Sequence, residues 1–437
     1  MRWKTDNLAG WGRALRTTSQ IARPERLAAL TGLVGDAAVP AIGNRRSYGD
    51  ACLNDRGKLI DMTRLDRFLG FDPETGVLNV EAGLSIGQIV STMAPRGWLP
   101  AVMPGTGFAT VGGAIAMDVH GKNHHGHGSF GQHVKSLTLL TGGKLKKITP
   151  DRPARLFRAT LGGLGQTGII VSAELQLMRC KGDVVMVTEQ RATGFEHFID
   201  LLNGSHATYS VGWIDATARG KDLGRGILEE AETGAGLVPP AKASKSVPFN
   251  APRFALSAPV VRLFNTAYFR RVPARGRTVV KPISEFFFPL DRIHDWNRLY
   301  GKNGFHQFQC VVPMDQAPAL KDMLTRIADS GLASPLAVLK RMGSGRAGYM
   351  SFPMEGYTLA VDFRAGLATE RLVMTLQDAT AQAGGRIYLA KDSLAAPDKI
   401  RAMYPEYDDW AAEVAKADPD GALATDLVRR LGLRSVA

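Results

Sequence analysis

The chain has 437 residues, of which 45% are hydrophobic and 22% charged, with a formal net charge of +13. This composition excludes a disordered or fibrous protein, and the length exceeds one ordinary hydrophobic core, so we expect two or three domains. The three widely spaced cysteines exclude a disulfide framework, and without an apolar N-terminal segment or a run of ~18 apolar residues we expect neither a secretory signal nor a spanning helix.

Short elements alternate in the first part of the chain. Residues 22–31 are predicted as a short helix that Gly32 ends. Ser85 is predicted to cap a second helix, which ends before Gly97. Strands are expected at residues 38–42, 58–62, 77–80, 134–140 and 169–177. This succession favours an α+β domain.

The most unusual stretch is the glycine-rich segment at residues 103–135, which holds eight glycines and five of the nine histidines. Glycine lets backbone N–H groups come close to a ligand, and successive free N–H groups form a concave anion site. Residues 109–119 are small and apolar, which suits a backbone packed against a flat group. Composition alone equally allows an ordinary glycine-rich surface loop.

A second glycine motif, Gly163 to Gly168, satisfies the G-x-G-x-x-G pattern of dinucleotide-binding folds. That motif must follow a strand and open a helix. Here residues 153–159 are predicted as a helix before it, and residues 169–171 as a strand after it. The order is reversed, so we reject a Rossmann site.

The sequence pattern changes after residue 182, where longer apolar segments predicted as strands alternate with segments predicted as amphipathic helices. Strands are predicted at residues 208–214, 282–288, 305–312, 336–340 and 357–363, and helices at 317–329 and 369–383. This pattern favours a sheet-and-helix domain.

A basic segment, residues 233–284, interrupts that domain. It contains no Asp or Glu but nine Lys and Arg, interleaved with apolar and aromatic residues. Its length allows a mobile lid, and its mixture of basic and apolar side chains suits contact with an anionic membrane surface or a lipid-phosphate substrate. A solvated loop would share this composition, and no recognisable nucleic-acid module accompanies it.

Three motifs carry a resemblance to a known family: Arg46 to Asp50 (RSYGD), residues 103–135 with TVGGAIA and HGKNHH, and Tyr388 to Ser393. They resemble the vanillyl-alcohol-oxidase type of FAD oxidoreductase, and in detail the oxidases of decaprenylphosphoryl-ribose 2′-epimerases. The resemblance covers nearly the whole chain. It implies an α+β fold with a PCMH-type FAD-binding domain at residues 1–182, a substrate domain at 183–385, and a C-terminal segment, 386–437, that returns to the FAD domain.

The resemblance also implies how FAD is held. In that family the short loop cradles the pyrophosphate and the glycine-rich stretch follows the isoalloxazine. Tyr48 stands where several relatives carry a histidine bonded to the flavin, which points to non-covalent FAD. The residues implied in cofactor binding are Gly43, Asn44, Arg45, Arg46, Ser47, Tyr48, Gly49, Asp50, Ala51, Gly105, Thr110, Val111, Gly112, Gly113, Met117, Asp118, Val119, His120, Ile170 and Tyr388.

Lys391 and His120 are the predicted catalytic residues. The family's lysine at the position of Lys391 contacts flavin and substrate and is essential for oxidation, whereas a lysine beside Asp392 is otherwise usually a surface pair. His120 ends the glycine cradle and is a candidate for proton handling, although a lone histidine is usually structural. No Cys or Glu completes a metal shell around the neighbouring histidines, so we expect no metal.

Five further residues match the family's substrate pocket: Lys122, Trp213, Gln307, Gln309 and Lys340. Both glutamines lie on one predicted strand and share a face. Lys340 could meet a phosphate, and Trp213 could pack on the sugar or the prenyl chain. By themselves all five could be ordinary core or rim residues.

One departure from the family concerns the predicted strand at 357–363. Ala360 stands where mycobacterial relatives carry a cysteine that covalent inhibitors trap, and Thr358 stands where they carry an asparagine. We therefore expect this protein to resist that trapping. The change leaves the implied catalytic residues intact but weakens the inference about the lipid and the sugar.

The resemblance implies oxidation of the C2 hydroxyl of a polyprenyl-phosphate-linked ribose, with an NADH-dependent short-chain reductase as the partner that completes epimerisation. We expect peripheral contact with the inner membrane, on the cytoplasmic face for lack of a signal, although relatives have been assigned to the periplasm. Two alternatives stay open: a soluble sugar or aldonolactone oxidase of the same superfamily, and a non-catalytic basic protein that binds a membrane surface.

Overall fold

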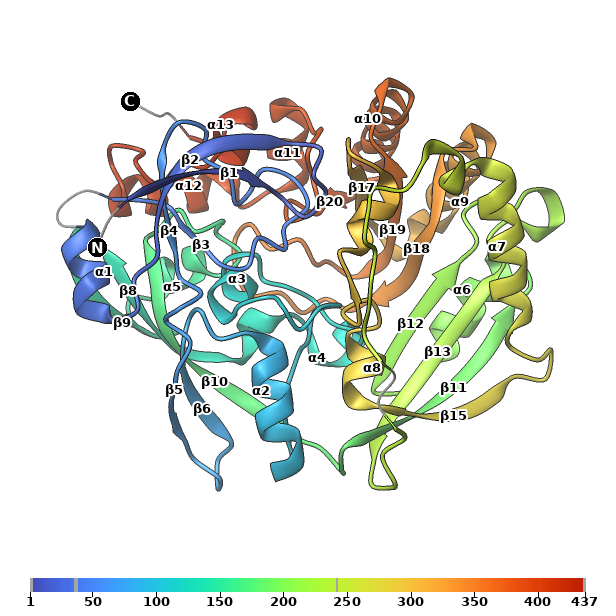
Figure 1. The fold of residues 1–437 in the computed structure, drawn as a ribbon, viewed down its shortest axis with the longest axis horizontal. Coiled ribbons are helices and arrows are strands. Elements are labelled where there is room, and N and C mark those ends of the chain that lie inside the picture. Colours follow the sequence, from blue (N-terminus) through green and yellow to red (C-terminus); the bar gives the residue numbers. More distant parts are fainter. Residues whose placement is uncertain (1–2, 35–37, 241–242, 435–437) are drawn as a thin grey trace.

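The computed structural model describes residues 3–34, 38–240 and 243–434, which form two lobes side by side (Figure 1). The first and the last described residues both lie in the same lobe. None of the helices in these three ranges combines the length and the hydropathy needed to cross a membrane.

The first lobe contains two sheets. The smaller has the order β1-β2-β4-β3, formed by β1 (Lys4–Ala9), β2 (Arg16–Ala22), β4 (Lys58–Asp61) and β3 (Ala41–Ile42). The larger has the order β5-β6-β10-β8-β9, with β7 also paired to β10; its strands are β5 (Phe68–Phe71), β6 (Val77–Glu81), β7 (Trp98–Pro100), β8 (Val134–Thr141), β9 (Lys144–Ile148) and β10 (Ile169–Arg179).

Short helices pack between and around these two sheets. They are α1 (Leu27–Val34), α2 (Ile86–Met93), α3 (Val111–Ala116), α4 (His124–His127) and α5 (Ala154–Thr160). The predicted cap of α2 is confirmed: the Ser85 hydroxyl accepts from the Gln88 backbone N–H, and the Gln88 side chain accepts from the Ser85 N–H. This reciprocal pair satisfies two backbone donors that the helix itself leaves free.

The second lobe is built on one large sheet. Its order is β15-β11-β13-β12-β18-β19-β17-β20, with β11 (Val184–Ala192), β12 (Tyr209–Ile214), β13 (Gly226–Gly234), β15 (Arg277–Pro282), β17 (Phe305–Val312), β18 (Ala333–Met342), β19 (Gly356–Arg364) and β20 (Arg386–Ile387). A small parallel pair, β14 (Lys245–Ser246) and β16 (Ile293–His294), lies outside it.

Adjacent residues of β12 show which helices cover each face of the large sheet. Gly212 faces α6 (Phe195–Gly204), since a Cβ there would lie 2.3 Å from the Phe198 ring. Trp213 points the other way, and its ring lies 4.7 Å from that of Tyr268 on α7. The helices of this lobe are α6, α7 (Ala258–Arg270), α8 (Ile283–Phe287), α9 (Ala317–Ser330) and α10 (Leu367–Gln382).

Helices α6, α9 and α10 bury the Gly212 face in the largest hydrophobic core, whereas α7 and α8 cover only part of the Trp213 face. Because side chains alternate along a strand, the uncovered part of that second face presents polar residues of β17, β18 and β19. It is turned toward the first lobe (Figure 1).

Most predicted elements are found within a few residues of their expected bounds, but two predictions are wrong. Gly32 does not end the first helix, because α1 continues to Val34. Residues 282–288 are not a strand: the run forms α8, whose helical spacing buries Ile283, Phe286 and Phe287 together. An apolar run this short has no periodicity that separates the two structures.

The basic segment at residues 233–284 differs from the expected single loop. Its last part forms α7 and β15, and β15 pairs with β11 at the edge of the large sheet. Three of its nine cations, Arg271, Arg277 and Lys281, are held by the buried carboxylate of Glu189. Lys242 lies outside the described residues. Mobility of the remainder stays a prediction.

The C-terminal segment continues from β20 into α11 (Pro397–Met403), α12 (Tyr407–Ala417) and α13 (Asp426–Arg430). Helix α12 packs on α5 of the first lobe, and the Asp426 N–H donates to the carbonyl of Leu53. These contacts accord with the implied return to the first domain, whose boundaries stay a prediction.

We predict that Glu189→Gln destabilises the protein by about 3 kcal/mol, because three cations lose their buried partner. Burial raises the pKa of Glu189, but the hydrogen bonds from Arg271 and Arg277 and the charge of Lys281 outweigh it and hold the pKa below its usual range. Its contribution is therefore complete above about pH 5 and lost as the pH falls below the ordinary glutamate pKa of about 4.3.

Thermal unfolding from pH 3 to pH 8 measures this contribution. The control is Glu174→Gln, which removes a largely solvent-exposed pair with Lys147 and should cost less than about 1 kcal/mol. Equal losses in the two variants at pH 7 would contradict the anchoring role of Glu189.

Candidate functional site

The three sequence motifs meet where the two lobes face each other. A Cβ on Gly43 would lie 2.2 Å from the Thr110 hydroxyl, so the short loop presses against the glycine-rich stretch. The Tyr48 N–H donates to the carbonyl of Ala390 (2.9 Å). A Cβ on Gly49 would lie 1.9 Å from the carbonyl oxygen of Asp392, so only glycine permits this approach of the two loops.

Backbone donors of the short loop are free to bind an anion. Within the described ranges, the N–H groups of Asn44, Arg45, Arg46 and Ser47 have no hydrogen-bond acceptor. Arg45 adopts a positive φ of 51°, which turns successive N–H groups toward one side. The loop therefore has the donors that a pyrophosphate needs, and the residues present fit FAD at this point.

Side chains of the same loop are fixed by neighbours. The Arg46 guanidinium lies between the rings of Trp11 (4.1 Å) and Phe108 (4.5 Å). The Asn44 amide donates to the Phe108 carbonyl, and Trp11 N–H donates to the carbonyl of Ser47. These contacts hold the loop open without using its N–H groups.

The glycine-rich stretch contributes mainly shape. The N–H groups of Val111, Gly112 and Gly113 are already bonded, to Leu84, Ala82 and the Thr110 hydroxyl. A Cβ on Gly105 would meet no atom within 4 Å, so the backbone there borders open space. The predicted cofactor residues Val119 and Ile170 are buried in the core behind it.

The side chain of the predicted cofactor residue Asp118 is bonded within the protein. Its carboxylate is buried and accepts from the N–H groups of Gly131 (2.8 Å) and Ala347 (3.1 Å) and from the Ser351 hydroxyl (2.5 Å). Asp118 therefore ties residues 347–351 of the second lobe to the glycine-rich stretch. A cofactor contact through its side chain stays unsupported by this geometry.

An aromatic wall borders the site. The His120 ring lies 5.3 Å from Tyr388 and 5.6 Å from Phe352, and Tyr388 and Phe352 stack at 4.6 Å. Met117 and Ala390 line a narrow gap together with Phe352 and Tyr388. A flat, apolar wall beside free backbone donors suits a group with a planar ring and a charged tail.

Lys391 enters this region from the loop that follows β20. Its ammonium lies 3.3 Å from the centre of the Tyr48 ring. In the part of the chain that the structure describes, no oxygen lies within hydrogen-bond or ion-pair distance of Lys391 Nζ. Burial lowers the pKa of Lys391, and the charge of Asp362 opposes that shift.

Asp362 is the acidic group of the site. It is 1% exposed, and its carboxylate accepts from the Gln307 amide (2.5 Å) and the Tyr300 hydroxyl (3.3 Å). Burial raises the pKa of Asp362, and the Gln307 hydrogen bond and the Lys391 charge oppose the shift. Lys391 and Asp362 are thus both pushed toward their neutral forms by the same dry environment.

His120 is held between two side chains of the large sheet. Lys340 Nζ lies 2.8 Å from Nδ1, and the Gln309 amide lies 3.1 Å from Nε2. Burial and then the Lys340 ammonium lower the pKa of His120 well below its usual value. A neutral imidazole accepts at only one nitrogen, so when Nδ1 accepts from Lys340 the proton is on Nε2, and Nε2 can donate to Gln309 only if that amide turns its oxygen toward the ring.

Lys340 and Lys122, the two lysines predicted in the substrate pocket, have internal partners. Lys340 Nζ also donates to the carbonyl of Gly121 (2.6 Å), and burial lowers the pKa of Lys340 to about 7. Lys122 Nζ donates to the Phe286 carbonyl and lies 3.9 Å from the Phe286 ring centre, and burial lowers its pKa to about 8. Their contact with substrate stays a prediction.

The register of the sheet brings the remaining predicted residues onto one face. Gln309 pairs with Ala360, Gln307 with Asp362, and Thr358 with Lys340. Gln309 also donates to the Thr358 hydroxyl, while Trp213 donates to the Pro335 carbonyl and packs under Tyr268. Ala360 and Thr358, the two departures from the family, therefore both lie on the site face.

Arg430 of helix α13 joins two of the motifs. Its guanidinium contacts both oxygens of Asp50 (2.7 and 2.9 Å) and one oxygen of Asp392 (2.9 Å), and it donates to the carbonyl of Ala395. Burial raises the pKa of Asp50, and the Arg430 hydrogen bond opposes the shift. The residue next to Lys391 is thereby fixed to the short loop.

Three of the four remaining histidines of the glycine-rich stretch bond to backbone groups. His124 Nδ1 accepts from the Gly343 N–H, and His125 and His133 contact the carbonyls of Ala207 and His127. Among the residues that the structure describes, no three His, Cys, Asp or Glu side chains are grouped to hold a metal ion.

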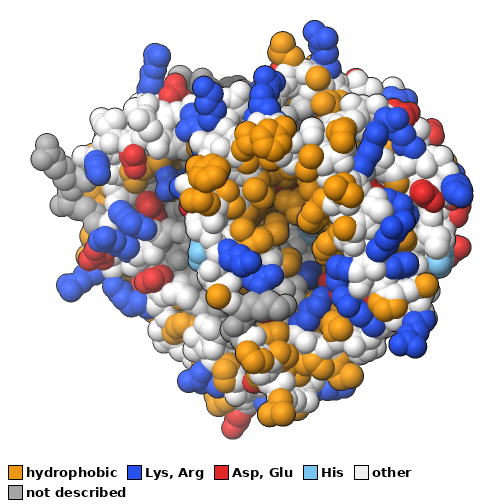
Figure 2. Space-filling view, turned by 45° about the vertical axis from the view of Figure 1, so that its right-hand side comes forward, with side chains coloured by type: hydrophobic (Ala, Val, Ile, Leu, Met, Phe, Trp, Pro, Cys, Tyr) orange, Lys and Arg blue, Asp and Glu red, His pale blue; other side chains and the backbone are white. Residues whose placement is uncertain are grey.

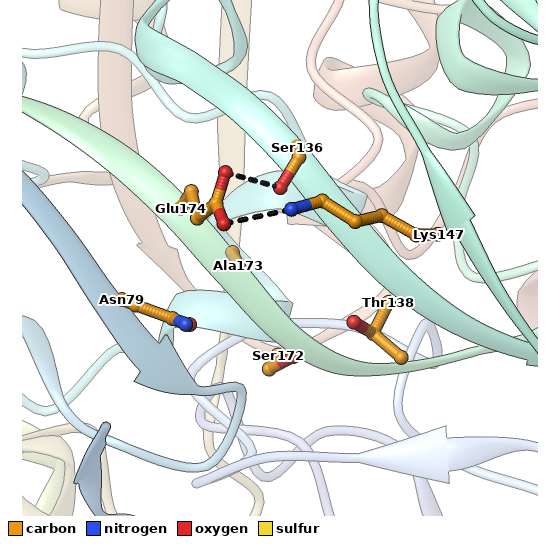
Figure 3. A pocket seen from close by; sticks show the side chains of 7 residues that line it. All are labelled: Asn79, Ser136, Thr138, Lys147, Ser172, Ala173 and Glu174. Carbon is orange, nitrogen blue, oxygen red and sulfur yellow. Dashed lines mark hydrogen bonds and ion pairs between the residues drawn. The ribbon is translucent and has the colours of Figure 1, made fainter. Parts of the chain in front are cut away.

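A separate polar hollow of about 80 Å³ lies on the solvent side of the β6-β10-β8-β9 sheet (Figure 3). The Glu174 carboxylate in this hollow accepts hydrogen bonds from the Ser136 hydroxyl and the Lys147 ammonium, each at 2.8 Å. None of the three motifs contributes to it, so we do not assign it a function.

Comparison with known proteins decides the family. The chain is 37% identical to the decaprenylphosphoryl-beta-D-ribose oxidase of Mycolicibacterium smegmatis over 98% of both chains. The family model for an FAD binding domain matches residues 19–149, which include the short loop and the glycine-rich stretch. The chain belongs to the decaprenylphosphoryl-ribose oxidase family. It is an FAD-dependent oxidoreductase with an α+β, PCMH-type fold.

Two further relatives show how far this similarity extends. An uncharacterized protein of Streptomyces coelicolor is 32% identical over 80% of this chain and the whole of that one. The L-gulono-1,4-lactone dehydrogenase of Mycobacterium tuberculosis is 22% identical over 96% of this chain and 97% of its own.

Four site residues were missed by sequence reasoning: Asp362, Tyr300, Phe352 and Arg430. The alternation of β19 could have found Asp362, since it shares a face with Thr358 and Ala360. Nothing in the local sequence distinguishes Phe352 or Tyr300 from other buried aromatics. Arg430 lies 380 positions from Asp50, and no local pattern relates them.

We predict that Arg430→Met weakens FAD binding roughly tenfold, or about 1.4 kcal/mol, because Asp50 and Asp392 lose the cation that holds their loops together. Flavin titration of the apoprotein measures the affinity. The control is Arg434→Met, since Arg434 is also buried on the C-terminal segment but pairs with Asp418. Unchanged FAD affinity in Arg430→Met would contradict this role.

Proposed function

We propose that this protein oxidises the C2 hydroxyl of a polyprenyl-phosphate-linked ribose to the 2-keto sugar. Support comes from its 37% identity, over nearly its full length, to an enzyme named for decaprenylphosphoryl-β-D-ribose. The observation that carries the proposal at the site is the Lys391 ammonium, which is partly buried over the Tyr48 ring and has no oxygen partner among the described residues. A sugar hydroxyl would supply that partner.

Bound FAD supplies a two-electron acceptor for the hydride from the carbon that bears the hydroxyl. The hydroxyl proton needs an acceptor on the protein. Lys391 is better placed for this than His120, because burial favours its neutral amine while His120 Nδ1 already accepts from Lys340. Asp362 would then balance the charge of the protonated lysine.

The other site residues would orient the sugar. His120 can donate from Nε2, and Gln309 can shift its amide between the His120 ring and a substrate hydroxyl. The closed packing of Phe352 and Tyr388 excludes water from the reacting carbon, which strengthens these polar contacts. We further propose that FAD is held non-covalently, with Tyr48 packed against the Lys391 ammonium.

The proposal includes two partners and a location. A 2-keto sugar must be reduced to complete epimerisation, and an NADH-dependent short-chain reductase would supply that hydride. A lipid-linked substrate resides in a bilayer, so we propose peripheral contact with the inner membrane, at its cytoplasmic or periplasmic face. The full-length similarity to a lactone dehydrogenase keeps a soluble sugar or aldonolactone oxidase as the second candidate.

Anaerobic bleaching of the flavin absorbance tests the proposed substrate. We expect a prenyl-phosphoryl ribose to bleach the purified protein, and free ribose and an aldonolactone to leave it yellow. Bleaching by the free sugar or the lactone alone would assign the protein to the soluble sugar oxidases. A colourless protein that takes up no FAD would favour a non-catalytic role.

We predict that Lys391→Ala retains FAD and loses turnover by about 100-fold or more, the usual effect of removing a general acid–base group. FAD should stay bound because the donors of the short loop are backbone groups that the substitution does not alter. Absorbance at the flavin band and substrate-dependent bleaching measure the two effects. The control is Lys399→Ala, whose lysine pairs with Asp378 on the surface. Full activity in Lys391→Ala would refute the assignment.

A further inference from the structure

Helix α7 (Ala258–Arg270) exposes large apolar side chains to solvent. Its buried side carries Val261, which is 1% exposed, and the polar Asn265, which is fully inaccessible to solvent. Its outer side carries Leu263, Phe264 and Val260, which are 74%, 51% and 43% exposed. A helix that faces only water presents polar residues outward and apolar residues to the core, so the outer side of α7 lacks a partner in this structure.

A polar network fixes this orientation. The Asn265 amide donates to the Asp215 carboxylate (2.7 Å) and the Thr217 hydroxyl (3.3 Å). Arg225 pairs with the same carboxylate (2.8 Å) and donates to Thr266 of α7 (3.1 Å). Turning the apolar side inward would leave these buried groups without hydrogen bonds, which is costly. The exposure is therefore built into the fold.

Neighbouring segments extend the apolar side of α7. The turn at Arg253–Leu256 contacts both α7 and the turn at Trp296–Tyr300. From these segments and the chain just before them, Phe254, Phe249 and Leu299 are 70%, 69% and 41% exposed. Figure 2 shows hydrophobic side chains gathered around a hollow on this side of the molecule, with Lys and Arg beside them.

The segment that carries most of the apolar surface has charge of one sign. Residues 233–284 contain no acid. Five of their cations are exposed, and none of the five forms an ion pair with a described residue; they are Lys245, Arg253, Arg262, Arg270 and Arg275. The nearby acids Asp295 and Asp329 are paired with Arg298 and Arg219. Exposed apolar side chains beside unpaired cations match the interface of an anionic bilayer, where apolar groups enter the lipid and cations meet the headgroups.

We propose that α7 and the adjoining segment Phe249–Leu256 dock on an anionic lipid bilayer, with α7 lying in the plane of the interface. The docking face would hold the hollow between its apolar side chains against the membrane. This docking face specifies the membrane contact proposed above. It rests on the proposed function in one respect, namely that docking would deliver a lipid-linked sugar to the site without release into water.

Flotation of the full-length holoenzyme with vesicles tests the docking face. The vesicles contain phosphatidylcholine alone or with an equal amount of phosphatidylglycerol. We expect the native protein to bind the anionic vesicles at least about tenfold more tightly. Leu263→Ser/Phe264→Ser should weaken that binding by about tenfold or more, because two large side chains no longer enter the lipid.

The matched control is Leu367→Ser/Met374→Ser on α10, whose side chains are 72% and 49% exposed. It removes the same kind of surface outside the docking face and should leave vesicle binding unchanged. A third variant, Arg262→Gln/Arg270→Gln, should weaken binding to anionic vesicles by roughly fivefold per charge and leave the weak binding to neutral vesicles unaltered.

Turnover of a detergent-dispersed prenyl-phosphoryl ribose separates this proposal from the proposed function. The α7 variants should keep their FAD and their turnover in detergent while they lose vesicle binding. Failure of the native protein to float with anionic vesicles, or equal loss in the α10 control, would overturn the docking face. If the α7 variants bind vesicles as the native protein does but no longer bind the proposed reductase, the lipid docking face would be overturned in favour of a protein partner.

Discussion

The contact between the Arg430 guanidinium and the carboxylates of Asp50 and Asp392 is the interaction on which the site depends. It fixes the loop that offers free backbone donors to the segment that presents Lys391. Both loops are irregular, so no sheet or helix hydrogen bonds could hold them at the observed separation. The absence of a side chain at Gly49 lets them touch, and the Arg430 guanidinium, paired with two buried carboxylates, keeps them there. The position of Lys391 over Tyr48 follows from this pairing.

Local sequence patterns predicted much of the fold. The cap at Ser85, the reversed order around Gly163–Gly168 and the alternation of β17 are all decided by neighbours within a few residues, and all are found. Where the pattern carried no period the prediction was wrong, as in α8. The motifs indicated FAD through their resemblance to a known family, and the match of an FAD binding domain to residues 19–149 agrees with it.

The finer geometry of the site could not be predicted in the same way. The sequence analysis placed Lys340 and Lys122 in the substrate pocket. It did not predict that the ammonium groups of both lysines also donate to backbone carbonyls of the protein. A lysine on an apolar strand looks the same in either case, since the distinguishing carbonyl comes from a distant segment. The alternation of β19 places Asp362 on the site face, but its interaction with the charge of Lys391 depends on a segment that follows β20, and no local pattern relates the two residues.

The span of the Arg430 contact has a consequence for how the protein is made. The short loop is synthesised early, but its partner Arg430 lies 380 positions further along the chain. Domains of a growing chain fold in order from the N-terminus, so the first lobe can collapse before its cofactor loops are closed. Closure of the flavin site is therefore a late event in the folding of this chain, because it waits for the segment that carries Lys391 and Arg430.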